Sequence, residues 1–515
     1  MRCRTLAREL RRRGSEIAFV CRRQPGDLIG VLEAEFRVLT LAEVSVGQQG
    51  TGLTGRELYA SWLGCTEEQD AADCLVALHE AQIHSPDWLV LDHYGLGRAW
   101  QRRMQVGLAE QAGAGTRLLV VDDLADRPHE ATLLIDANRL GNTTTDPYRH
   151  LVPEATITLL GPAYALLDPL YTKLQPLLPV RTQLQRVLVF FGGVDRANHT
   201  AMALQALSHP KLQHLTLDVV LGMGSPHFDE LQAHAEQRPQ TSLHIGLSSL
   251  AGLMARADLA LGAAGITSWE RACLGLPSLV VPVAENQIQG ARALHTSGVA
   301  RCLLDVSAAA LVPALQTSLI ELLEEPDVLQ QMSEACLQLG DGRGLARVCA
   351  ALLGPAPGVR LRPAQSTDLW LYHWWANDVE VRRQSFNSEP IPLDEHRRWF
   401  QARLRSPWTL LRVLEDTDGL PLGQIRFERT AESSGPAVVG FSLDHLARGR
   451  GLAGQLLQLG LAELGRCWGV GTEAYGEVRA GNAASCRAFV RAGFQEGAPP
   501  RPGVRCFART APAPS

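Results

Sequence analysis

The chain has 515 residues, a formal net charge of −5 at pH 7 and 11 cysteines. This length predicts about two to four domains, and the small net charge excludes a strongly basic nucleic-acid-binding protein. No apolar run reaches the ~18 residues that a membrane span requires, and the Arg-rich start lacks the apolar segment of a secretory signal. The cysteines are scattered without a C-x-x-C pair, so we expect reduced thiols, a cytoplasmic protein and no metal site.

Residues 1–354 alternate short apolar segments with helical ones, a pattern that predicts doubly wound α/β layers. A proline-containing stretch at 166–184 separates two such layers. We therefore expect two Rossmann-like halves, at 1–168 and 184–353, that bind ligands at the carboxyl ends of their strands. The expected buried parallel strands are 17–21, 88–92, 118–121, 157–160, 187–191, 217–220, 259–261 and 279–283.

The first half begins with an amphipathic segment rather than a strand. Residues 4–13 predict a helix with Leu6 and Leu10 facing inward, and this helix leads into the strand 17–21. A βαβ unit requires a strand before such a helix. We therefore expect the first half to lack its first strand.

A loop of small residues follows the strand 259–261 and opens a helix. The backbone N–H groups of Gly265, Thr267 and Ser268 are candidates to bind a phosphate, because the start of a helix attracts anions. Glu270 lies farther into this helix, where a carboxylate can accept both hydroxyls of a ribose. An ordinary strand-to-helix turn, in which Glu270 only stabilises the helix start, is an equal alternative.

Two further strand ends are expected at the same edge of this sheet. Gly192 and Gly193 follow one strand, and Asn286 lies in the polar segment 284–287 after another. An amide next to a carboxylate suits the recognition of sugar hydroxyls or of an acetamido group. These residues extend the candidate site from a phosphate to a sugar.

A second candidate site lies beyond the linker-like segment 354–358 (GPAPG). The loop 448–454 (RGRGLAG) separates an expected strand, 438–443, from an expected helix, 455–464. Its glycines let the backbone approach a pyrophosphate, which the unpaired N–H groups and the dipole of the helix attract. An ordinary turn is the alternative. The residues that would contact the anion are Arg448, Gly449, Arg450, Gly451, Ala453 and Gly454.

The last third of the chain, assigned to a domain at 359–510, resembles the GNAT superfamily of acetyl-CoA-dependent N-acetyltransferases. Arg448, Gly451 and Ala453 match the pyrophosphate loop of this superfamily, and 482–494 match its later N-x-x-S-x-x-x-aromatic-x-x-x-G-F segment. The resemblance implies a GNAT α/β domain with acetyl-CoA as co-substrate. It also implies a splayed strand that binds the pantetheine.

The resemblance assigns further residues in this domain. Phe441 and Leu443 on the splayed strand, together with Asn482 and Ser485, would contact acetyl-CoA. Many relatives carry a tyrosine at the position of Phe489 that protonates the leaving thiolate, so the general acid of this chain stays open. Glu477 is a candidate to relay the amine proton, or it is a surface residue of a strand.

Residues 1–350 resemble the UDP-sugar hydrolase of pseudaminic acid synthesis, which releases UDP from UDP-2,4-diacetamido-2,4,6-trideoxy-β-L-altropyranose. The resemblance implies the GT-B-like fold, two Rossmann-like halves that face a cleft. It implies that Glu270 binds the uridine ribose, that the 265–268 backbone binds the diphosphate, and that Asn286 and Tyr94 bind the sugar. The matching segments are 92–94, 121–127, 160–166, 191–195, 267–270 and 284–287.

The hydrolase family opens with a strand and a Gly-x-Gly-His loop whose histidine is its expected catalytic base. The chain as written starts after that position. His93 is the nearest substitute for the base, and packing beside Tyr94 is its alternative role. We expect the chain as written to hydrolyse the UDP-sugar poorly, and whether this half is active stays open.

The segment from Trp375 to Phe400 resembles the acetyltransferase that precedes the hydrolase, acting on UDP-4-amino-4,6-dideoxy-N-acetyl-β-L-altrosamine. The two resemblances together imply a bifunctional enzyme with a UDP-linked amino sugar and acetyl-CoA as partners. From the charge and the lack of a long apolar run, we expect neither nucleic acid nor a membrane as a partner. The alternatives are a related nonulosonic or coat-polysaccharide pathway, and an acetyltransferase fused to an inactive nucleotide-sugar-binding module. The oligomeric state is open.

Overall fold

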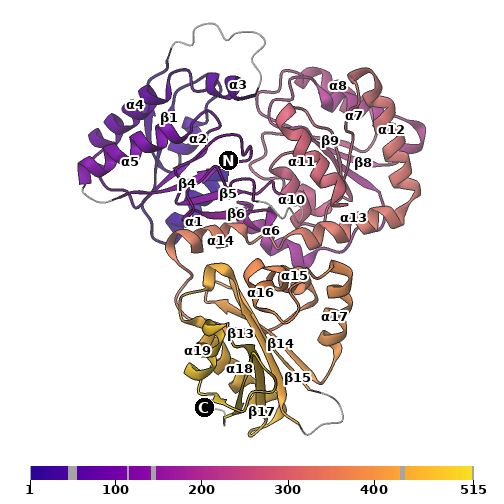
Figure 1. The fold of residues 1–515 in the computed structure, drawn as a ribbon. Coiled ribbons are helices and arrows are strands. Elements are labelled where there is room, and N and C mark those ends of the chain that lie inside the picture. Colours follow the sequence, from indigo (N-terminus) through magenta and orange to yellow (C-terminus); the bar gives the residue numbers. More distant parts are fainter. Residues whose placement is uncertain (1, 45–54, 113–114, 141–145, 430–434, 513–515) are drawn as a thin grey trace. The chain divides into compact units, whose positions relative to one another are not determined.

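The computed structural model describes residues 2–44, 55–112, 115–140, 146–429 and 435–512 (Figure 1). It divides into two compact units, Met1–Val348 and Cys349–Ser515. The boundary lies inside a helix, α14 (Gly344–Leu353), ahead of the predicted linker 354–358. Within the described ranges, no helix is both long and apolar enough to cross a membrane.

The first half of unit 1 carries two separate parallel sheets. β1 pairs with β2, and β3 to β6 form a four-stranded sheet in chain order. Leu6 and Leu10 are buried on α1, as the sequence predicts. The elements are α1 (Arg2–Arg12), β1 (Ala18–Arg22), α2 (Ile29–Glu33), β2 (Arg37–Leu41), α3 (Gly55–Ser61), α4 (Glu67–Glu80), β3 (Trp88–Leu91), α5 (Arg98–Ala112), β4 (Arg117–Val121), β5 (Leu133–Asp136) and β6 (Ile157–Leu160).

β1 and β3 are the first strands of these two sheets in chain order. β1 and β3 are mostly half-buried, whereas β5 is buried throughout and β4 is exposed only at its first residue. Residues of both sheets nevertheless belong to one apolar cluster, which includes Leu41 of β2 and Leu91 of β3. Among the described residues, β1 pairs only with β2 and β3 pairs only with β4. Each of these two strands therefore has one unpaired edge.

The second half of unit 1 holds one six-stranded parallel sheet in the order β12-β11-β10-β7-β8-β9. Alternate strand residues pack into two different clusters, with Val187 and Val219 in one and Leu188 and Val220 in the other. Helices therefore cover both faces, as predicted. The elements are α6 (Pro169–Leu174), β7 (Arg186–Phe190), α7 (His199–Leu207), β8 (Thr216–Leu221), α8 (Phe228–Gln237), β9 (Thr241–Ile245), α9 (Ala251–Arg256), β10 (Leu259–Gly262), α10 (Thr267–Cys273), β11 (Ser278–Val280), α11 (Glu285–Thr296), β12 (Ala300–Cys302), α12 (Ala308–Glu324) and α13 (Pro326–Leu339).

Unit 2 is built on one seven-stranded sheet in the order β13-β14-β15-β16-β17-β19-β18. All neighbours are antiparallel except β16 and β17. Gly460 of α18 approaches Ile425 on one face of β15, and Trp399 of α17 contacts Arg426 on the other. The elements are β13 (Val359–Pro363), α15 (Leu369–Asn377), α16 (Val379–Gln384), α17 (Leu393–Arg405), β14 (Thr409–Asp416), β15 (Pro421–Glu428), β16 (Ala437–Leu443), α18 (Leu452–Trp468), β17 (Glu473–Arg479), α19 (Ala483–Arg491), β18 (Gln495–Glu496) and β19 (Val504–Thr510).

Candidate functional site

The parallel pair β16 and β17 separates soon after it forms. Only Ala437 and Val438 of β16 pair with β17, through Ala474 and Tyr475. Beyond this fork, β16 stays paired with β15 and β17 with β19. Among the described residues no strand enters the gap, so the gap offers backbone groups to an extended ligand. Phe441 and Leu443, the predicted pantetheine contacts, lie on β16 beyond the fork.

Gly476 and Phe489 close one face of this gap. A Cβ atom at Gly476 would lie 2.6 Å from Cζ of Phe489, so glycine is required for this approach. Phe489 packs against the rings of Phe441, Phe494 and Phe507, with centroid distances of 5.6, 4.9 and 5.1 Å. Phe489 stands at the position of the proton-donating tyrosine that the family resemblance implies, and here it is part of an apolar aromatic cluster that offers no proton donor.

The loop after β16 has the backbone that an anion site needs. Gly449 and Gly451 have φ values of 74° and 78°, and Gly451 is the N-cap of the 17-residue helix α18. The helix starts at Leu452 rather than at the predicted residue 455, which puts Ala453 and Gly454 in its first turn. The first N–H groups and the dipole of α18 therefore point at the space beside this loop.

Arg448 and Arg450 differ in their surroundings. The guanidinium of Arg448 pairs with Asp378 at 2.7 Å and donates to the carbonyl of Leu443 at 3.1 and 3.2 Å. Arg448 therefore ties the end of β16 to the start of α16, and its contact with a pyrophosphate stays a prediction. Arg450 is exposed next to Gly451, where its charge would favour a bound anion.

Asn482 and Ser485 contact each other at the start of α19. Asn482 is the N-cap residue, and its Oδ1 accepts the N–H of Ser485 at 3.1 Å. Such a cap contributes about 0.5–2 kcal/mol to helix stability. The structure thus gives Asn482 a structural role beside its predicted contact with acetyl-CoA.

Tyr475 and Glu477 lie side by side on β17, one at the fork and one beyond it. The Tyr475 hydroxyl donates to Oε1 of Glu477 at 3.3 Å, and Arg501 donates to Oε2 at 3.2 Å. Burial and the Glu477 charge raise the pKa of Tyr475 to about 12, so this phenol is protonated at neutral pH. Sequence reasoning missed Tyr475, although residues 359–510 contain only one other tyrosine, Tyr372.

In unit 1, the loop between β10 and α10 is held by an internal network. The N–H of Gly265 donates to Oγ of Ser268 at 3.3 Å, and the N–H of Ser268 donates to the Gly265 carbonyl at 2.8 Å. Arg271 donates to the same Oγ and to the Ala263 carbonyl. The predicted diphosphate donors of Gly265 and Ser268 are therefore engaged inside the loop, whereas Thr267 begins the helix and is half-buried.

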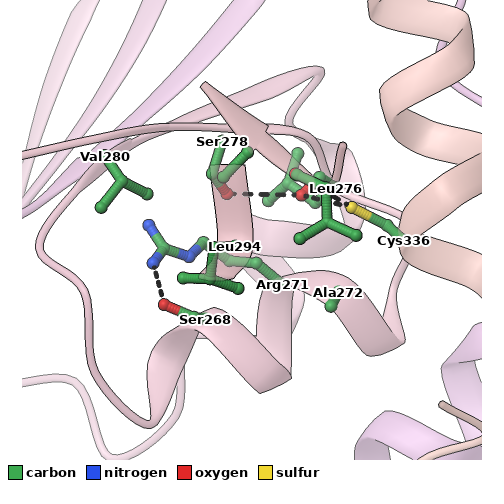
Figure 2. A pocket seen from close by; sticks show the side chains of 10 residues that line it. Ser268, Arg271, Ala272, Leu276, Ser278, Val280, Leu294 and Cys336 are labelled. Carbon is green, nitrogen blue, oxygen red and sulfur yellow. Dashed lines mark hydrogen bonds between the residues drawn. The ribbon is translucent and has the colours of Figure 1, made fainter. Parts of the chain in front are cut away.

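Figure 2 shows the space behind this loop, with the Arg271 side chain directed to Ser268. The cavity measures about 10 Å³, close to the room for one water, and Ser278 also lines it. Burial lowers the pKa of Arg271 to about 10, so its guanidinium is charged at neutral pH. Arg271 therefore positions the loop from inside the protein and does not reach a ligand directly.

Glu270 faces α6. The Tyr171 hydroxyl donates to its carboxyl group. Burial raises the pKa of Glu270 to about 7, although Tyr171 and Arg271 favour the charged form. The predicted ribose ligand is therefore a carboxyl group that titrates near neutral pH.

The carboxyl ends of β3 and β4 gather charged and polar side chains. Arg2 pairs with Asp92 at 2.7 Å and with Asp123 at 2.9 Å, and the Tyr94 hydroxyl donates to Asp123 at 2.5 Å. His93 Nδ1 accepts the N–H of Gly95 at 3.0 Å, and burial lowers the pKa of this imidazole. With its proton on Nε2, His93 has no lone pair left for a water, which favours a packing role.

The remaining predicted sugar-site residues follow strands of the second half. Gly192 and Gly193 come after β7, and Gly192 has a φ of 106°. Asn286 is the second residue of α11, and its side chain lies outside the described part of the structure. β7, β10 and β11 are parallel neighbours, so these loops share one edge of the sheet. In the described ranges, no three His, Cys, Asp or Glu side chains are grouped to hold a metal ion.

Two family models match separate parts of the chain. Residues 187–344 match the glycosyltransferase family 28 C-terminal domain, and residues 359–495 match the acetyltransferase (GNAT) domain. The spore coat polysaccharide biosynthesis protein SpsG of Bacillus subtilis (strain 168) is 29% identical over 195 residues, 37% of this chain and 57% of the relative.

A second relative is a UDP-N-acetylglucosamine–N-acetylmuramyl-(pentapeptide) pyrophosphoryl-undecaprenol N-acetylglucosamine transferase from Salinibacter ruber. It is 30% identical over 155 residues, 29% of this chain and 41% of the relative. The chain spans about half the length of the curated relatives it matches.

Among solved structures, a Vibrio cholerae spermidine N-acetyltransferase in complex with CoA and spermine aligns with 30% of this chain and 95% of its own. The sequence identity is 18% and the TM-score is 0.27. From the two family matches, the chain is an α/β protein in which a GT-B-like glycosyltransferase region precedes a C-terminal GNAT acetyltransferase fold. This combination is consistent with sugar biosynthesis.

Proposed function

We propose that unit 2 transfers the acetyl group of acetyl-CoA to the amine of a UDP-linked amino sugar, and that unit 1 binds the acetylated product. The observation that carries this proposal is the gap between β16 and β17, which ends at the Gly451-capped start of α18. The family 28 match supports a nucleotide sugar as the shared substrate. The substrate that fits the sequence resemblance is UDP-4-amino-4,6-dideoxy-N-acetyl-β-L-altrosamine.

In this proposal acetyl-CoA lies along β16. Its pyrophosphate binds beside Gly449 and Gly451, and its pantetheine pairs with the backbone from Leu443 back toward the fork. The six residues from Leu443 to Val438 are five steps apart and span about 16 Å at the usual rise of a strand. That length brings the thioester to the fork, next to Tyr475.

The proposed reaction is a direct attack of the amine on the thioester carbonyl. The C–N bond forms, the C–S bond breaks, and backbone N–H groups of the gap stabilise the developing oxyanion. Glu477 accepts the proton that the amine loses, and Tyr475 donates a proton to the leaving thiolate. Tyr475 then recovers a proton from its hydrogen-bonded neighbour Glu477.

We further propose that unit 1 hydrolyses UDP-2,4-diacetamido-2,4,6-trideoxy-β-L-altropyranose, in which water cleaves the bond between the sugar and the diphosphate and gives UDP and the free sugar. Glu270 would contact the ribose, the loop around Thr267 the diphosphate, and Tyr94 and Asn286 the sugar. A second candidate is nucleotide-sugar binding without hydrolysis, which the engaged Nδ1 of His93 favours. The two functions are separated by measuring free UDP formed from the UDP-sugar, by chromatography, with wild type and with His93→Ala. Hydrolysis produces free UDP, whereas binding alone does not.

Glu270→Ala is expected to weaken UDP binding by about 1–3 kcal/mol, the scale of a lost charged hydrogen bond. Calorimetric titration with UDP at pH 8, where the carboxyl group is ionised, measures the loss. Glu236→Ala serves as the control, because Glu236 is an exposed carboxylate of α8 in the same half and belongs to none of the candidate binding loops. Equal UDP affinity in wild type and Glu270→Ala would remove Glu270 from the ribose site.

Glu270→Gln is expected to change the pH dependence of stability. The pKa of Glu270 is raised from 4.5 to about 7 in the folded protein. The folded state therefore holds this proton more tightly than the unfolded state does. The resulting contribution to the free energy of unfolding is fully present below pH 4.5 and is lost as the pH rises to about 7. Chemical denaturation should show that the stability of Glu270→Gln relative to wild type increases across this window. A constant difference would contradict the burial of an ionising carboxyl group.

A further inference from the structure

Three aromatic side chains form a cluster at the carboxyl end of β3. Tyr59 of α3, Trp62 just after α3 and Tyr94 just after β3 pack on one another. Their ring centroids lie 5.1 Å apart for Tyr59 and Trp62, 5.5 Å for Tyr59 and Tyr94, and 6.2 Å for Trp62 and Tyr94. Trp62 nevertheless remains 42% exposed. A large aromatic surface is thus left open to solvent beside the candidate sugar site.

The backbone around this aromatic cluster holds it in place. A Cβ atom at Gly95 would lie 2.6 Å from the Tyr59 carbonyl oxygen, so only glycine lets α3 pack against the turn after β3. The Trp62 carbonyl accepts a hydrogen bond from Gln24 at 2.8 Å. The Tyr94 hydroxyl is fixed on Asp123. The aromatic surface is therefore pre-organised, which lowers the entropic cost of binding.

Carboxylates from both halves of unit 1 act on Tyr59 through their charge. Burial raises the pKa of Tyr59, and the charges of Asp126 and Glu285 raise it further. Asp126 follows β4 in the first half, whereas Glu285 begins α11 in the second half. Tyr59 therefore lies within electrostatic range of one acidic residue from each half of unit 1. Aromatic faces flanked by hydrogen-bond acceptors suit a ligand with an apolar face and a hydroxyl-bearing edge.

We propose that Tyr59 and Trp62 form a stacking surface for the sugar ring of the nucleotide sugar. The C–H face of a pyranose packs on the two rings, and Asp126 and Glu285 accept hydrogen bonds from its hydroxyl or acetamido groups. This inference rests on the proposed nucleotide-sugar site of unit 1 and adds a determinant of sugar binding. UDP carries no such sugar ring, so its binding does not involve Tyr59 and Trp62.

The local test uses the full chain labelled with 5-fluorotryptophan and followed by ¹⁹F NMR. Loss of one resonance in Trp62→Phe assigns Trp62. UDP-N-acetylglucosamine is expected to shift this resonance, and UDP is expected to leave it in place. Trp408, an exposed tryptophan of unit 2, is the internal control. No shift of the Trp62 resonance at saturating UDP-N-acetylglucosamine, or an equal shift with UDP, overturns the stacking surface.

The energetic test compares the same two ligands by calorimetry. Trp62→Ala should lower the affinity for UDP-N-acetylglucosamine about five- to tenfold and leave that for UDP unchanged, whereas Trp62→Phe retains most of the affinity. Equal losses for both ligands would assign Trp62 a structural role and overturn the proposal. If wild type binds no UDP at all, the nucleotide site itself is wrong. Normal UDP binding with no effect of Trp62→Ala rejects the stacking surface alone.

Discussion

Gly451→Asp is expected to abolish the binding of acetyl-CoA. Gly451 has a φ of 78° at the N-cap of α18, a conformation that costs other residues about 1–2 kcal/mol. The aspartate also brings a negative charge to the place where the pyrophosphate would bind, so repulsion replaces the attraction of the helix dipole. Calorimetric titration with acetyl-CoA should show no binding heat.

The matched control for this change is Gly471→Asp. Gly471 lies just beyond the opposite end of the same helix, has a φ of 87°, and has no atom within 4 Å of the place where a Cβ would stand. This control adds the same charge at a positive φ away from the loop, so it should keep its affinity for acetyl-CoA. Unchanged affinity in Gly451→Asp would remove the loop 448–451 from the acetyl-CoA site.

Tyr475→Phe is expected to lower kcat for acetyl transfer by about 10²–10⁴, the usual effect of losing a general acid. Its Kd for acetyl-CoA should stay the same, because the hydroxyl acts only on the departing thiolate. The rate is measured as release of free CoA thiol with the UDP-linked amino sugar as acceptor. A wild-type kcat in Tyr475→Phe would show that another group or water protonates the thiolate.

Tyr372→Phe is the control for this substitution. Tyr372 is the other tyrosine of unit 2, and its buried hydroxyl donates to the carbonyl of Arg412. Its loss should reduce stability by about 0.5–1.5 kcal/mol, as for an ordinary hydrogen bond, and leave kcat unchanged. A fall in kcat in both variants would indicate a general disturbance of the sheet.

The apolar strands of unit 1 could be predicted because burial on both faces produces continuous runs of Val, Leu and Ile. The expected strands 157–160 and 259–261 agree with β6 and β10 to within one residue. β5 and β12 were missed because strands of three or four residues give little periodic signal. β2 and β9 were missed because both are largely half-exposed and mix polar with apolar residues, so neither forms a continuous apolar run. The expected strand 279–283 ends early at Val280, because Pro282 has no N–H to continue the ladder.

The candidate sites were only partly predictable, because spacing places a residue on a loop but does not show its partner. The glycine positions of the loop 448–451 followed from the strand–loop–helix pattern. The ion pair of Arg448 with Asp378 did not, because it joins residues far apart in the sequence. Tyr475 was missed for a similar reason, since its role depends on where β16 and β17 separate. Trp62 carries no motif and became a candidate only through its contacts with Tyr59 and Tyr94.

The most direct test of the proposed function is acetyl transfer by the full chain to UDP-4-amino-4,6-dideoxy-N-acetyl-β-L-altrosamine. The chain, acetyl-CoA and this acceptor are incubated together. The nucleotide sugars are then separated, and their masses are determined by mass spectrometry. We predict one acetyl group added to the acceptor for each CoA released, with no product from Gly451→Asp. Release of CoA without an acetylated UDP-sugar, or no reaction with this acceptor while spermidine is acetylated, would contradict a nucleotide-sugar acetyltransferase.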